Sequence, residues 1–166
     1  TRRQTRSCIL SRGLGDVYKR QVEMWLHHSW RTAFPGVDFR FEAPEQPIAF
    51  VGDPGRLHQM LDKLIENAVS FHTKNTPIEI ELTLTTEHQI QIIVANEGPV
   101  IPDELKSQIF NSMISSRKKN DKQPHLGLGL YIAREIASQY KGSIKAESNA
   151  DSSGTRFLIT LTSSGN

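Results

Sequence analysis

Apolar residues between positions 57 and 72 recur with the spacing of one helix face. They follow the i, i+3, i+4, i+7 pattern: Leu57, Met60, Leu61, Leu64, Ile65, Ala68 and Val69. Asp53 and Pro54 precede this run as an N-cap and a first helical residue. The pattern predicts a long amphipathic helix that packs on a large apolar surface. Asn67 lies at the border of the apolar stripe, where its carboxamide is either simply exposed or directed toward a site beside the helix.

Other segments alternate apolar and polar residues, as half-buried strands do. Strands are expected at residues 37–42, 48–51, 78–85, 90–96, 144–146 and 154–161. Further helices are expected at residues 22–34, 102–110 and 130–140. Strands paired through hairpins, with helices between them, predict an α+β fold. We expect a two-layer α/β sandwich with a mixed, mostly antiparallel sheet and its helices on one face.

Asn96 lies at the end of an expected strand and on the same face as three apolar residues, Ile90, Ile92 and Val94. Glu97-Gly98-Pro99 then breaks the strand. A single hydrogen-bonding side chain on an apolar floor suits the edge of a purine base. The alternative is a buried asparagine that caps its own turn.

A long polar stretch at residues 111–125 precedes Gly127-Leu128-Gly129-Leu130 and an expected helix. Loops of this length inside a compact domain are usually functional or mobile. Glycines before a helix allow a phosphate to approach free backbone N–H groups. The alternative is a flexible joint, and the motif matches neither a P-loop nor a dinucleotide fingerprint.

Length and composition fit one globular domain of 166 residues. Residues 1–20 hold six Lys/Arg and one acid, so the rest of the chain carries a net charge of −3 and no basic face for nucleic acid. These twenty residues look like translated adapter sequence, and we expect a non-native or disordered tail there. The domain is expected at residues 21–163, with a short tail at 164–166. The single Cys8 excludes an internal disulfide, and no apolar run approaches membrane-spanning length, so we expect no membrane contact.

The six histidines form no His-Glu-x-x-His motif, and no Cys/His cluster accompanies the single cysteine. A zinc site is therefore not expected.

The three polar motifs, in this order, resemble the N, G1 and G2 boxes of the histidine-kinase ATP-binding domain, in the GHKL ATPase superfamily. They are Asn67 on the long helix, the Asn-Glu-Gly-Pro run at 96–99, and GLGL at 127–130. The lead-in at residues 53–61 and the final Gly-Thr-x-Phe at 154–157 are also similar to that family. The resemblance covers roughly residues 37–161 and implies the Bergerat ATP-binding fold.

The resemblance implies ATP and Mg²⁺ as ligands, with Asn67 binding the Mg²⁺ that bridges the phosphates. Asn96 would accept a hydrogen bond from the adenine amino group, and Gly98 would let the backbone approach the nucleotide. The residues expected at the ATP are Asn67, Asn96, Gly98, Arg117, Lys118, Gly127, Leu128, Gly129, Leu130 and Thr155. Arg117 and Lys118, in the expected lid, either reach a phosphate or belong to a solvated loop.

Four positions depart from the family pattern. Asn96 replaces an Asp, which removes charge assistance from the adenine hydrogen bond. Val100 replaces the second glycine of the G1 box, and His125 the first glycine of a fuller G2 box. Lys63 stands where many sensor kinases have another Asn and where related ATPases have a hydrolytic Glu. The missing Glu argues against independent ATP hydrolysis.

None of the six histidines is followed by an acidic residue, so the phosphoacceptor His of a kinase is absent from this sequence. The resemblance therefore implies the ATP-binding catalytic domain of a two-component sensor histidine kinase. It would transfer the γ-phosphate of ATP to a His on a separate dimerisation domain. A response regulator would be a further partner, and nucleic acid would not. The domain would be cytoplasmic, with its parent in a bacterial inner membrane. The alternative is a degenerate nucleotide-binding regulatory module without kinase activity.

Overall fold

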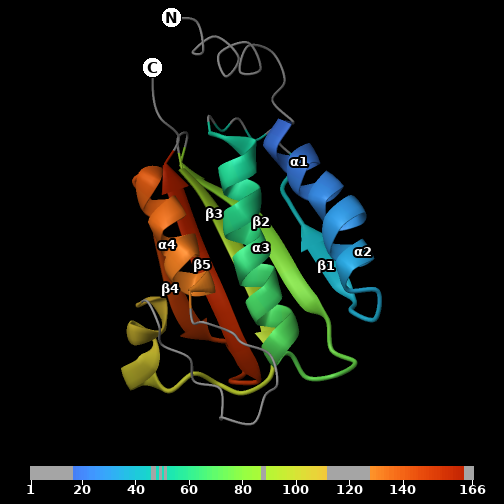
Figure 1. Ribbon diagram of the computed structural model, residues 1–166, viewed down its shortest axis with the longest axis vertical. Helices are drawn as coiled ribbons and strands as arrows, with labels where there is room; N and C mark the ends of the chain where they lie inside the picture. Colours follow the sequence, from blue (N-terminus) through green and yellow to red (C-terminus); the bar gives the residue numbers. More distant parts are fainter. Residues whose placement is uncertain are drawn as a thin grey trace, which may run out of the picture.

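The computed structural model describes residues 17–45, 48, 50, 52–86, 89–111 and 128–162. In these ranges the chain forms a five-stranded sheet of order β1-β2-β3-β5-β4 (Figure 1). The strands are β1 (Phe39–Glu42), β2 (Ile78–Thr86), β3 (Gln89–Glu97), β4 (Ser143–Ser148) and β5 (Gly154–Thr162). β1 is parallel to β2, and the other neighbouring strands are antiparallel. The expected mixed, mostly antiparallel sheet is confirmed.

The helices cover one face of this sheet, as Figure 1 shows for α3 and α4. The helical elements are α1 (Val17–Trp25), the π-helical turn η1 (Leu26–Trp30), α2 (Arg31–Ala33), α3 (Pro54–Phe71) and α4 (Gly129–Gln139). α3 and α4 run in opposite directions, so the C-terminal end of α3 and the N-terminal end of α4 lie at the same end of the sheet (Figure 1). The two-layer α+β sandwich is confirmed.

The central helix α3 begins where the sequence predicts. The Asp53 side chain accepts hydrogen bonds from the backbone N–H groups of Gly55 (2.8 Å) and Arg56 (3.3 Å). Pro54 follows as the first helical residue, where its missing N–H costs nothing. The helix ends at Phe71, and the N–H of His72 still donates to the carbonyl of Ala68 at 2.8 Å. Asp53 therefore satisfies two of the N–H groups that a helix start leaves unpaired.

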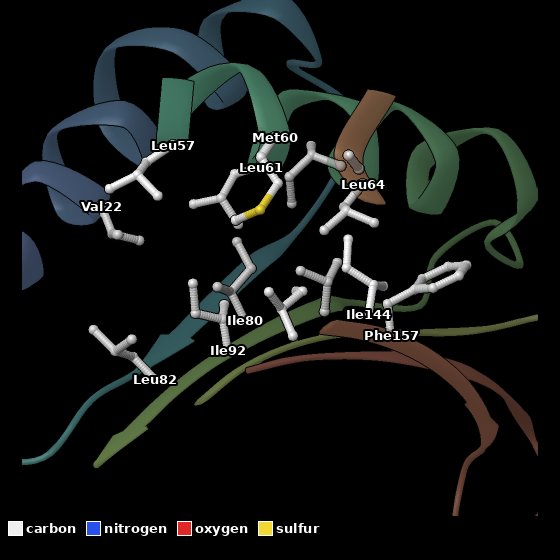
Figure 2. Packing of buried hydrophobic residues seen from close by; sticks show 14 of the residues in the cluster. Val22, Leu57, Met60, Leu61, Leu64, Ile80, Leu82, Ile92, Ile144 and Phe157 are labelled. Atoms are coloured by element: carbon white, nitrogen blue, oxygen red, sulfur yellow. The ribbon is translucent and has the colours of Figure 1, made fainter. Parts of the chain in front are cut away.

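The core lies between α3 and the sheet (Figure 2). The buried residues of α3 are those of the predicted apolar stripe: Leu57, Met60, Leu61, Leu64, Ile65 and Ala68. They face alternate residues of the central strands, including Ile80, Ile92 and Phe157, which are almost completely buried. Each such side chain contributes roughly 1.5–3 kcal/mol on leaving water. This burial fixes the rotation of α3, and with it the direction in which Asn67 points.

The N-terminal helix differs from the prediction because it begins at Val17, inside the segment expected to be a tail. Tyr18 is buried, and its ring lies 5.5 Å from that of Phe50. The helix then widens into a π-helical turn. Trp25 and Trp30, five residues apart, both lie near His58, with ring-centroid distances of 4.8 and 6.3 Å. A π-helix brings residues i and i+5 to the same side, so both indole rings are buried.

The expected helix at residues 102–110 is instead two 3₁₀ turns, Asp103–Leu105 and Gln108–Phe110. Their backbone hydrogen bonds span three residues, as from Leu105 N–H to Pro102 O (2.9 Å) and from Asn111 N–H to Gln108 O (2.9 Å). The second turn buries Phe110, whose ring packs edge-on against Phe157 at 6.1 Å. Periodicity suggested a helix because 3₁₀ and α spacing differ little over so short a segment.

Two other expectations fall wholly or partly outside the described residues. Most of the polar stretch at 111–125 lies there, and so do two of the four residues of the strand expected at 48–51. Ile48, which is described, is fully buried and belongs to no strand.

Candidate functional site

The C-terminal half of α3 is flanked by two glycines that the sequence singled out. A Cβ at Gly98 would come within 2.3 Å of the carbonyl oxygen of Phe71, and Gly98 has a φ of +151°. A Cβ at Gly129 would lie 3.7 Å from Cδ of Lys63. Asn67 is four residues from Lys63 and four from Phe71, one helical turn in each direction. The three motifs, spread over more than sixty residues of sequence, therefore meet on a two-turn stretch of one helix.

Asn67 is half-buried on α3, as its place at the border of the apolar stripe predicts. No hydrogen bond joins its carboxamide to another described residue. A free amide oxygen is a ligand that suits Mg²⁺, a hard cation that usually keeps several waters and takes few protein ligands. In the described ranges no group of three or more His, Cys, Asp and Glu side chains is placed to hold a metal. The amide oxygen of Asn67 therefore suits a cation whose remaining ligands are phosphate oxygens and water.

Asn96 is only 4% exposed and lies at the end of β3. Its Nδ2 donates to the backbone carbonyl of Glu97 at 3.1 Å. The reverse orientation of the amide would oppose two oxygens, so this bond fixes which end of the carboxamide faces which way. The Oδ1 atom of Asn96 is thereby left as an acceptor for another group.

The turn between β4 and β5 holds the segment around Asn96 in place. Asn149 donates from Nδ2 to the backbone oxygen of Asn96 (3.3 Å), and the N–H of Gly98 donates to Ser153 O (3.0 Å). A Cβ at Gly154 would come within 2.0 Å of the Asn96 oxygen, so only glycine permits this approach. Sequence reasoning missed Asn149 and Ser153, since turn-forming residues carry no sign of which distant backbone they contact.

Thr155 is the register partner of Asn96 across β3 and β5 and is buried. Its Oγ1 donates to the carbonyl of Pro99 at 3.4 Å. Thr155, near the start of β5, therefore lies beside Asn96, near the end of β3, at the same end of the sheet. A shared site requires this proximity. The backbone of the 96–99 segment is held by both this threonine and the 149–154 turn.

Lys106 anchors the segment that follows the 96–99 motif. Its Nζ donates to Asp103 Oδ1 (2.5 Å) and to Ser148 Oγ at the end of β4 (3.0 Å). The hydrogen bond from Lys106, reinforced by its charge, lowers the pKa of the Asp103 carboxyl. The two 3₁₀ turns are thus tied to the sheet edge next to the candidate site.

The start of α4 differs from that of α3 because no side chain of a described residue caps it. Leu128 occupies the N-cap position without a side-chain hydrogen bond, and the first turn holds no acidic residue. The intrahelical ladder begins with Ile132 N–H donating to Leu128 O at 2.9 Å. The preceding N–H groups, those of Gly129 and Leu130 among them, are donors of the kind that bind an anion at a helix N-terminus.

Arg117, Lys118 and Gly127, also expected at the site, lie outside the described residues. Asn111, the last described residue before that gap, is joined to α4 by a hydrogen bond from Arg134 Nη1 at 3.4 Å. Among the described residues, no helix is both long and apolar enough to cross a membrane.

Comparison with known proteins agrees with this geometry. Residues 52–164 match the family of histidine kinase-, DNA gyrase B- and HSP90-like ATPases. The heme sensor protein HssS of Staphylococcus haemolyticus is 34% identical over 69% of this chain and 24% of its own length. The sensor histidine kinase CusS of Escherichia coli K12 is 32% identical over 76% of this chain and 25% of its own. The chain thus spans about a quarter of these two relatives.

Solved structures of histidine kinases share the fold of this chain over nearly its whole length. The nucleotide-free catalytic domain of histidine kinase ThkA superimposes with a TM-score of 0.72 and 26% identity, covering 89% of this chain and 93% of that one. The mycobacterial sensor histidine kinase MprB has the same fold, with a TM-score of 0.73 at 19% identity, over 88% of this chain and 94% of that one. The chain belongs to the histidine kinase-, DNA gyrase B- and HSP90-like ATPase family, and its fold is that of a histidine-kinase catalytic domain.

Proposed function

We propose that this chain binds Mg-ATP as the catalytic domain of a sensor histidine kinase. It would transfer the γ-phosphate to a His on a dimerisation domain outside this sequence. The observation that carries the proposal is the meeting of Gly98, Asn67 and Gly129 on two turns of α3. Gly98 belongs to the segment that carries the base-binding Asn96, Asn67 offers a ligand for the cation, and Gly129 begins a helix with free N–H groups for the phosphates. These are the parts that a bound nucleoside triphosphate needs.

The adenine end of the site is assigned to Asn96, Gly98 and Thr155. Asn96 Oδ1 is a fixed acceptor, because Nδ2 is engaged by the Glu97 carbonyl. An acceptor there complements the exocyclic amino group of adenine. Thr155 lies beside Asn96 in the strand register, and Gly98 leaves room for the backbone to approach the base.

The phosphate end is assigned to Asn67 and to the first N–H groups of α4, at Leu128, Gly129 and Leu130. Bound through the Asn67 amide oxygen, Mg²⁺ would neutralise charge on the phosphates. The backbone N–H groups would donate hydrogen bonds to the phosphate oxygens in a fixed geometry. Arg117, Lys118 and Gly127 remain predicted phosphate contacts.

In the transfer itself, an imidazole nitrogen of the acceptor His attacks the γ-phosphorus. The bond from that phosphorus to the bridging oxygen breaks, and ADP leaves with the electron pair. This chain contributes position and charge stabilisation rather than a nucleophile. The acceptor domain and a response regulator are therefore its proposed partners. We place the domain in the cytoplasm and its parent protein in a bacterial inner membrane.

Calorimetric titration with Mg-ADP and with a non-hydrolysable ATP analogue tests the binding proposal. Asn67→Ala should weaken Mg-dependent binding by about tenfold or more, as loss of a group that positions a metal does. Gln59→Ala is the matched control, since Gln59 is an exposed carboxamide two turns earlier on α3. Absence of nucleotide binding by the wild-type chain would contradict the proposal.

Kinase activity requires a second experiment. The chain is fused to an upstream hairpin that carries a phosphoacceptor His and is assayed for phosphohistidine with ATP. Transfer that depends on Asn67 is the expected result. Binding without any transfer would instead identify a nucleotide-binding regulatory module.

A further inference from the structure

Lys63 lies on the same face of α3 as Asn67, one turn nearer the N-terminus. Its side chain runs along the start of α4, because Cδ and Cβ lie 3.7 and 3.9 Å from the position of a Cβ on Gly129. Two atoms, Cε and Nζ, extend beyond this contact. The ammonium nitrogen is therefore two bonds from the Cδ atom that contacts the start of α4, and Lys63 is one helical turn from Asn67 on α3.

The ammonium group of Lys63 forms a weak ion pair with the carboxylate of Glu66. Lys63 Nζ lies 3.2 Å from Glu66 Oε2, and the two side chains are 30% and 54% exposed. Ion pairs between exposed side chains contribute about 0–1 kcal/mol, because water competes and side-chain entropy is lost. A phosphate with a charge near −2 can therefore displace the Glu66 carboxylate from Lys63 at small cost.

We propose that Lys63 is a phosphate-binding residue of this site, which leaves Glu66 and pairs with the terminal phosphates of the bound nucleotide. The inference rests on the proposed nucleotide-binding function and adds a specificity-determining residue to it. Lys63 then selects for the number of phosphates, whereas Asn96 selects for the base. Glu66 holds the ammonium in place while no nucleotide is bound.

The test is calorimetric titration of the whole chain with a non-hydrolysable ATP analogue, ADP and AMP, each with Mg²⁺. Lys63→Met retains the aliphatic stem against Gly129 and removes only the charge. It should weaken binding of the ATP analogue by about tenfold, as expected for one charge-assisted contact, and leave AMP within about twofold. Lys63→Arg should restore the preference for the triphosphate.

Glu66→Gln supplies an independent arm. Releasing Lys63 from its ion pair should tighten binding of the ATP analogue about twofold to threefold, in line with the strength of an exposed pair. In the Lys63→Met/Glu66→Gln double variant this gain should disappear, which isolates the coupling between the two residues.

Lys145→Met is the matched control, since Lys145 is an exposed lysine on strand β4. Thermal unfolding establishes that each variant is folded. Equal losses for AMP and the ATP analogue in Lys63→Met, or no loss for either, would overturn the role of Lys63. Failure of the wild-type chain to bind any nucleotide would instead overturn the proposed function, and the inference with it.

Discussion

The carbonyl oxygen of Phe71 occupies the space that a side chain on Gly98 would need. The separation to an added Cβ is 2.3 Å, and the φ of +151° is itself unfavourable for any residue with a Cβ. The last turn of α3 therefore packs directly on the backbone of the 96–99 segment. This contact sets the separation between Asn67 and Asn96, the two ends of the proposed site.

Gly98→Ala should accordingly damage both stability and binding. We expect the free energy of unfolding to fall by about 2–3 kcal/mol, because backbone strain and a backbone clash add together. Nucleotide affinity should fall by tenfold or more. Urea denaturation and calorimetry measure the two effects.

Gly142→Ala is the control for that variant. A Cβ on Gly142 would come within 2.1 Å of Thr160 O, but Gly142 follows the opposite end of α4. It should lose comparable stability and retain nucleotide affinity under conditions in which it is folded. Normal affinity in Gly98→Ala would show that the contact with Phe71 does not shape the site.

Asn96→Leu should remove base recognition with little change in size. The Glu97 carbonyl remains satisfied, because it also accepts from Thr73 N–H at 2.8 Å. We expect ATP, ADP and AMP all to bind at least about tenfold more weakly, since each loses the same hydrogen bond and leaves its amino group unpaired. Uniform loss across the three nucleotides separates this variant from Lys63→Met.

The same orientation of Asn96 predicts discrimination between bases. Guanine presents a carbonyl oxygen where adenine presents an amino group, and two acceptors would then face each other. The wild-type chain should bind the GTP analogue more weakly than the ATP analogue, and Asn96→Leu should reduce that difference. Tighter binding of the GTP analogue would mean that the amide points the other way, and equal binding would mean that Asn96 does not contact this edge of the base.

Trp30→Phe should lower stability without affecting the nucleotide. The Trp30 Nε1 donates to Asp62 Oδ1 at 2.6 Å, a hydrogen bond to a charged group that joins the N-terminal helical segment to α3. We expect a loss of about 1.5–3 kcal/mol in the free energy of unfolding, because Asp62 loses this donor. Chemical denaturation measures the loss, and unchanged affinity for the ATP analogue is the expected companion result.

Tyr18 gives a pH-dependent prediction. Burial is the main cause that raises the pKa of its hydroxyl above the ordinary value of 10.0. In the described part of the chain the hydroxyl also has no hydrogen-bond partner. Tyr18→Phe should therefore be neutral or slightly stabilising at pH 7, because no buried polar atom is left unpaired.

Ionisation of Tyr18 in the folded state is disfavoured, so stability is retained below pH 10 and lost as the pH rises through the raised pKa. Melting temperatures between pH 9 and 11 should fall more steeply for the wild-type chain than for Tyr18→Phe. Parallel curves would show that Tyr18 is not buried.

Local pattern determined much of the fold. The 3.6-residue period fixed α3 and its buried face, and the two-residue period placed Asn96 on the core side of β3, because both depend only on neighbouring residues. The same patterns were wrong at residues 102–110 and at the start of the N-terminal helix. In both places, contacts with distant residues decided the local geometry.

The sequence by itself also supplied the three motifs, Asn67, the 96–99 segment and the glycines before α4, and their order. Only the tertiary structure decided that Gly98 and Gly129 meet α3 one turn on either side of Asn67. It alone showed that Nδ2 of Asn96 is engaged by the Glu97 carbonyl, and that Lys63 runs along the start of α4. Each of these relationships depends on how closely two backbones pack, and that separation is set by the whole core rather than by any local run of residues.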